Sequence, residues 1–177
     1  KAVDKLLGQL KSKHGYCLVY GIGYGDLIRE LIKRTKMHII VLPRGRDNVN
    51  AFRREMDDSG FYGKRVAVLN GKLSDLPPYF ANLAVIENPV ENEQEFSRIL
   101  RPYGGKVIFL YGNGLIAEKK GALPGSGSWT HQYADAGNSL VSKDKLVKLP
   151  LGILWFGGPS NDKILPRHGH GPSPQII

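Results

Sequence analysis

The fold of this chain is decided at Val19-Tyr20-Gly21-Ile22-Gly23-Tyr24-Gly25-Asp26, a glycine-rich stretch that joins two segments of different pattern. Before it, residues 16–20 form a short apolar run, which is typical of a strand buried on both faces of a parallel sheet. After it, apolar residues recur at the spacing of one helical face: Leu27, Ile28, Leu31 and Ile32. A strand, a glycine loop and a helix in this order predict a βα unit whose loop lies at a ligand crevice.

Each glycine of this loop has a physical use. Gly21 permits a sharp turn, and Gly23 lets the backbone approach a ligand where a Cβ atom would clash. The helix behind the loop offers free N–H groups at its first turn. The dinucleotide-binding pattern places its third glycine at the position of Asp26, whereas here it is Gly25. The alternative is a glycine-rich turn that binds nothing.

The alternation of strands and helices continues along the chain. Further strands are expected at residues 37–42, 66–69, 83–86 and 106–111. Further helices are expected at residues 2–12, after Asp47 as a capping residue, and at residues 91–100. Strands alternating with helices predict a Rossmann-like, doubly wound α/β fold with a parallel sheet. Right-handed crossovers then give five parallel strands in the order 3-2-1-4-5.

Two motifs make the resemblance specific. Residues 21–25 look like motif I of class I S-adenosylmethionine (SAM)-dependent methyltransferases. Residues 98–105 resemble the family's R-x-L-x-P-G-G turn before the fifth strand, with Tyr103 as an extra residue. The resemblance covers residues 15–111 and implies a methyltransferase-like domain over residues 1–117. It implies a cofactor site at Tyr20, Gly21, Ile22, Gly23, Gly25, Pro43, Asn70 and Gly71.

Three positions depart from the family pattern. Val19 stands where the family usually carries an acid, and Asn70 stands where an Asp commonly meets the adenine. Pro43 falls where the second strand usually ends in an acid that accepts hydrogen bonds from the ribose hydroxyls. Losing that acceptor should cost about 1–3 kcal/mol of binding. The resemblance therefore implies a degenerate module with weak or absent SAM binding. The alternatives are an active methyltransferase with an unknown acceptor and a different nucleotide in the same crevice.

Candidates for catalysis are few. Glu87 and Asn88 follow the fourth strand, where the family places groups near the substrate. The alternative for Glu87 is that it caps the helix expected from Glu91. Methyl transfer to a good nucleophile needs mainly proximity and orientation, so the lack of a clear base does not exclude an enzyme.

Residues 118–177 have a different texture, rich in Gly, Pro and polar residues, with one strand expected at residues 149–156. Residues 121–128 read as a flexible break. Residues 129–135, 154–159 and 165–175 resemble the lead-in to propellers of pyrroloquinoline-quinone (PQQ) dehydrogenases. The resemblance implies a β-propeller partner domain and an extracytoplasmic, periplasmic location. An active methyltransferase would instead be cytoplasmic, where SAM is made.

Composition limits the remaining function classes. With 41% hydrophobic and 23% charged residues the chain is globular. Its net charge of +9 is spread along the sequence, which favours a solvated basic surface over a specific nucleic-acid site. No apolar run approaches the roughly 20 residues of a membrane span. His131, His168 and His170 have no neighbouring carboxylate or cysteine to complete a metal site, so no metal is expected.

Overall fold

The computed structural model describes residues 4, 7–8, 10, 12–23, 25–45, 47–90, 92–112, 114 and 116–150. The chain divides into two compact units, Lys1–Gly121 and Ala122–Ile177, and each is described by itself. The sequence places this boundary after residue 117. In the structure the first unit reaches further, because its last strand, Ile116–Lys119, pairs with the sheet.

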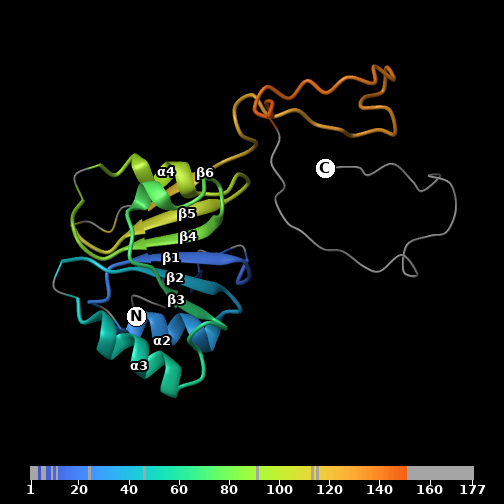
Figure 1. Ribbon diagram of the computed structural model, residues 1–177. Coiled ribbons are helices and arrows are strands. Elements are labelled where there is room, and N and C mark those ends of the chain that lie inside the picture. The colour runs from blue at the N-terminus through green and yellow to red at the C-terminus, as the bar shows by residue number, and fades with distance from the viewer. Residues whose placement is uncertain are drawn as a thin grey trace, which may run out of the picture. The chain divides into compact units, whose positions relative to one another are not determined.

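The first unit is built on a six-stranded sheet (Figure 1). Its strands lie in the order β3-β2-β1-β4-β5-β6. The first five are parallel, which confirms the expected order 3-2-1-4-5, and β6 runs antiparallel to β5. The strands are β1 (Tyr16–Tyr20), β2 (His38–Leu42), β3 (Val66–Val68), β4 (Ala81–Ile86), β5 (Gly105–Phe109) and β6 (Ile116–Lys119). The sequence did not predict β6, since a four-residue edge strand ending in Glu118 and Lys119 has little apolar alternation.

Helices cover both faces of this sheet. They are α2 (Gly25–Arg34), α3 (Val49–Asp58), the 3-10 helix η1 (Leu73–Asp75) and α4 (Glu95–Ile99). Figure 1 shows α2 and α3 together and α4 apart from them. Successive residues of β1 point to opposite faces, so Cys17 and Val19 join the core under α2 and α3, whereas Leu18 joins the core with Phe96. This arrangement is the doubly wound architecture predicted from the sequence.

The structure corrects two helix boundaries. Asn48, not Asp47, caps α3: its side chain accepts a hydrogen bond from the Ala51 backbone N–H at 3.1 Å. The helix expected over residues 91–100 is only α4, with Gln94 at its N-cap, because residues 92–94 are not helical and belong with residues 88–90 to the loop that follows β4. Of the helix expected at residues 2–12, the structure describes Asp4, Leu7 and Gly8 as helical. The strand expected at residues 149–156 lies almost wholly outside the described residues.

The described part of the second unit, residues 122–150, contains turns and no helix or multi-residue strand. Asp144 organises one turn by accepting hydrogen bonds from the N–H groups of Gly127, Leu146 and Val147 at 2.7–2.8 Å. The hydrogen bond from the Gly127 backbone contributes most to holding the pKa of Asp144 below its ordinary value. Of residues 122–150 only Ala134 is buried. Within the described ranges of both units, no helix is long and apolar enough to span a membrane.

Candidate functional site

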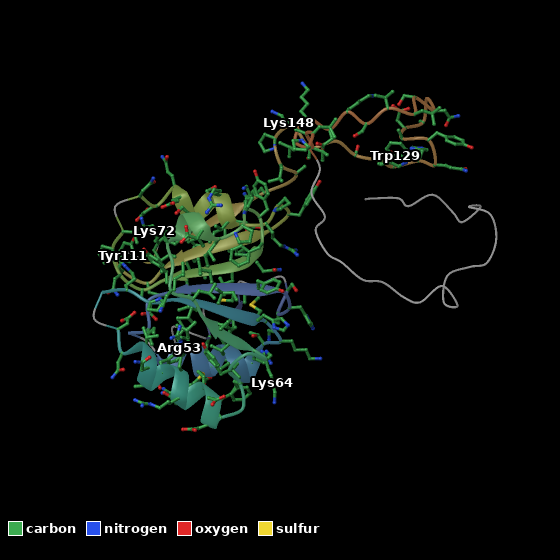
Figure 2. The ribbon with its side chains drawn as sticks, viewed as in Figure 1. Arg53, Lys64, Lys72, Tyr111, Trp129 and Lys148 are labelled. Atoms are coloured by element: carbon green, nitrogen blue, oxygen red, sulfur yellow. The ribbon has the colours of Figure 1, made fainter. Side chains whose placement is uncertain are left out.

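The predicted crevice lies at the carboxyl ends of the strands. Gly21 follows β1 with a φ of +113°, and its N–H donates to the Leu42 carbonyl at the end of β2, at 2.8 Å. On the other side of β1, the Glu87 N–H donates to the Tyr20 carbonyl at 3.4 Å. The chain leaves β1 toward α2, which packs on one face of the sheet, and leaves the neighbouring β4 toward α4, which packs on the other face. Doubly wound folds bind ligands at such a switch point. In Figure 2 Lys72 and Tyr111 lie at this end of the sheet.

The glycine loop makes room for Glu87 of the same chain. Glu87 is 2% exposed. A Cβ atom on Gly21 would lie 2.7 Å from Glu87 Oε2, and one on Gly23 would lie 3.2 Å from it. The carboxylate therefore occupies the space that these glycines leave open. Glu87 is neither the cap of α4 nor exposed to the crevice, and Asn88 beside it is exposed.

Alanine substitutions at these glycines should separate their roles. Gly21→Ala should lower the free energy of unfolding by about 1–3 kcal/mol, because its φ is unfavourable for an L residue and its Cβ meets a buried carboxylate. Gly25→Ala should be neutral or stabilising by up to about 1 kcal/mol, since Gly25 is helical and its Cβ would make ordinary contacts. Urea unfolding followed by circular dichroism measures both. Equal losses at the two positions would contradict this assignment.

Asp47 ties the glycine loop to the turn after β2. Its Oδ2 accepts hydrogen bonds from the Ile22 N–H at 3.0 Å and from the Arg44 N–H at 2.6 Å. One amide of the predicted cofactor loop is thus engaged within the chain. The local pattern predicted Asp47 only as a helix cap. Its contact with Ile22 spans 25 residues and has no local signature in the sequence.

Arg44 crosses the end of β1. Its guanidinium carbon lies 4.9 Å from the centroid of the Tyr20 ring, a cation–π arrangement. Its Nη1 donates to the carbonyls of Asn88 at 3.3 Å and Pro89 at 2.9 Å. The side chain therefore runs from the turn after β2 to the loop after β4. Pro43 was predicted as a site residue from the sequence, whereas Arg44 directly after it was not.

A cavity of about 520 Å³ opens beside Arg44. Its volume lies within the range of roughly 300–1,000 Å³ that small-molecule sites occupy. It is lined by Tyr20, Arg44, Leu73, Pro89, Val90, Asn92, Glu95 and Phe96. We name it the β1–β4 cavity. Tyr20 is the one predicted site residue among these lining residues. Asn70 and Gly71 are exposed in the turn after β3, and Pro43 is half-buried beside Arg44.

Aromatic rings continue from the β1–β4 cavity along the carboxyl ends of the strands. Ring centroids lie 5.4 Å apart for Tyr20 and Phe96, 6.2 Å for Phe96 and Phe109, and 5.6 Å for Phe109 and Tyr111. All three pairs meet edge to face, the favourable geometry for aromatic pairs. The Tyr111 hydroxyl donates to Glu93 Oε1 at 2.7 Å. Burial, and then this hydrogen bond, raise the pKa of Tyr111 above its ordinary value.

The described histidine, cysteine and carboxylate side chains form no group of three or more that could hold a metal ion. His131 is exposed in the second unit. His168 and His170 lie outside the described residues. Cys17 is buried in β1, and burial raises the pKa of its thiol, so it is held in its neutral form.

No family model and no curated protein matches the chain. Solved structures do. A Methanococcus maripaludis protein assigned as a SAM-dependent methyltransferase has 21% identity and a TM-score of 0.52, over 61% of this chain and 52% of that one. Geranyl diphosphate C-methyltransferase from Streptomyces coelicolor, in complex with S-adenosylhomocysteine, has 14% identity and a TM-score of 0.51. The match covers 61% of this chain and 44% of that one.

The [4+2]-cyclase SpnF is also similar, at 19% identity and a TM-score of 0.50, over 61% of this chain and 43% of that one. The chain thus spans about half the length of these structures. At these identities the likeness establishes architecture and not chemistry, and a neighbour named as a cyclase makes the same point. The first unit has the Rossmann-like fold of class I SAM-dependent methyltransferases.

Proposed function

We propose that the first unit is a degenerate methyltransferase-like module that binds SAM weakly or not at all, transfers no methyl group, and serves as a structural or ligand-binding part of a larger protein. The observation that carries this proposal is Arg44, whose guanidinium lies over Tyr20 and bonds to the loop after β4. The crevice is therefore crossed by a fixed positive charge of the chain itself.

Two effects weaken SAM binding in such a crevice. SAM has a positive sulfonium, and a second positive charge in the same solvent-exposed crevice disfavours its binding by roughly 1 kcal/mol. Pro43 offers no side-chain acceptor to the ribose hydroxyls, a loss of about 1–3 kcal/mol. The two effects add to roughly 2–4 kcal/mol, which is between one and three orders of magnitude in affinity.

The second candidate is an active SAM-dependent methyltransferase. The β1–β4 cavity and the position of Asp47 favour it. The Asp47 carboxylate accepts a hydrogen bond from Ile22 of the glycine loop, and Asp47 belongs to the turn that contains Pro43. A carboxylate accepts more than two hydrogen bonds, so Asp47 has capacity for a ligand hydroxyl besides its two backbone donors.

Calorimetric titration of residues 1–177 with SAM and S-adenosylhomocysteine tests the proposal. We expect a dissociation constant for SAM weaker than about 0.1 mM, with tighter binding by Pro43→Glu, which adds a ribose acceptor. Pro78→Glu, an exposed proline before the amino end of β4, is the matched control and should change nothing. A low-micromolar dissociation constant for the unaltered chain would put the active enzyme first.

The partner in this proposal is the β-propeller implied by the resemblance of residues 129–135, 154–159 and 165–175. Its PQQ-type character and the periplasmic location rest on those short motifs alone. The first unit would then serve the propeller as a structural or ligand-binding neighbour, connected to it through the flexible break at residues 121–128.

A further inference from the structure

We propose that the β1–β4 cavity binds a small planar ligand that carries a phosphate or carboxylate, with Arg44 as the anchor of the anionic group. This inference rests on the proposed function, because a cavity that still selected SAM would be built around a cationic ligand. The fold alone does not identify a ligand, whereas the lining of this cavity specifies its chemical class.

Arg44 is held in place with part of its binding capacity unused. Both of its hydrogen bonds to Asn88 and Pro89 come from Nη1. Neither Nε nor Nη2 has a hydrogen bond to any residue that the structure describes. These two atoms form the edge of a guanidinium that binds carboxylate or phosphate through two parallel hydrogen bonds. Because the Tyr20 ring and two carbonyls already fix the side chain, an anion would lose little affinity to ordering it.

The rest of the lining suits a flat ring. Tyr20 and Phe96 contribute aromatic surface, and Leu73 and Val90 contribute aliphatic surface. Such surfaces bury a planar ring and fix its orientation by stacking and edge contacts.

Polar groups from the loop after β4 and from α4 complete the cavity. Asn92 precedes α4, and Glu95 lies in its first turn. The Glu95 carboxylate repels an anion and accepts hydrogen bonds from an amine or hydroxyl. A ligand with its anionic group at Arg44 and a hydrogen-bond donor on its ring would pair with both the guanidinium and the Glu95 carboxylate. The net charge of +9 also favours the approach of anionic ligands over cationic ones.

Two ligand pairs, each differing in one anionic group, test this inference. Adenosine 5′-monophosphate is compared with adenosine, and indole-3-acetate with indole-3-ethanol, by titration of the full chain at low salt. We expect the anionic member of at least one pair to bind about ten-fold or more tightly, the order of one charge-assisted pair. A preference in the first pair alone identifies a phosphate ligand; a preference in the second alone identifies a carboxylate.

Variants assign that preference to Arg44. Arg44→Gln should abolish it, whereas Arg54→Gln, an exposed arginine on α3, should leave it unchanged. Glu95→Gln keeps Arg44 intact and should tighten the anionic ligand, so the inference stays testable if Arg44→Gln does not fold. The inference fails if neither pair shows a preference, or if the preference survives in folded Arg44→Gln. Tight SAM binding would instead overturn the proposed function, and weak SAM binding without anion preference would overturn the inference alone.

Discussion

Phe96→Ala is expected to lower the free energy of unfolding of the first unit by about 3–5 kcal/mol, the usual cost of removing a buried aromatic ring. The Phe96 side chain is 1% exposed. Its ring contacts those of Tyr20 and Phe109, and it attaches α4, a helix of only five residues, to the sheet. So short a helix has no stability of its own in water, so its position depends on this packing.

Urea denaturation followed by far-ultraviolet circular dichroism measures the effect. Phe80→Ala is the matched control: Phe80 is half-buried against the same core and should lose roughly half as much. Because Phe96 also lines the β1–β4 cavity, the variant should bind the planar probes more weakly than the unaltered chain. A loss below about 1 kcal/mol would mean that α4 is not fixed to the core.

Gly105→Ala is expected to be the most damaging of the glycine substitutions, with a loss of about 3 kcal/mol or more from overpacking. A Cβ atom at this position would lie 2.5 Å from the Arg101 carbonyl oxygen, 2.8 Å from the Arg101 nitrogen and 3.1 Å from the Ala81 carbonyl oxygen. These are backbone atoms of the turn before β5 and of β4, so no side-chain rotation relieves the overlap.

The measurement is again the free energy of unfolding, with Gly25→Ala as the control whose Cβ meets only the end of the Arg29 side chain at 3.6 Å. The register of β4 and β5 should also shift near Leu83 and Lys106, which exchange of their amide hydrogens would report. A Gly105→Ala protein as stable as the Gly25→Ala protein would show that the turn before β5 is more open than the structure has it.

The sequence by itself determined the order of the elements and the place of the crevice. The apolar runs of β1, β2 and β4 and the helical spacing in α2 record burial along a few consecutive residues, and such local patterns survive in a single sequence. With right-handed crossovers they give the strand order around β1. The edge strand β6 was not predicted, because none of its four residues is fully buried and its sequence has no apolar pattern.

Only the tertiary structure decided what fills the crevice. The loops that hold Ile22, Arg44 and Glu87 meet because parallel strands bring their carboxyl ends to one edge of the sheet. Arg44 then reaches a carbonyl 45 residues away, and Asp47 reaches an amide 25 residues away. Neither contact follows from the periodicity of its own segment, since each depends on strand order, register and the path of a second loop. The glycines could therefore be found from the sequence, whereas the groups that lie against them could not.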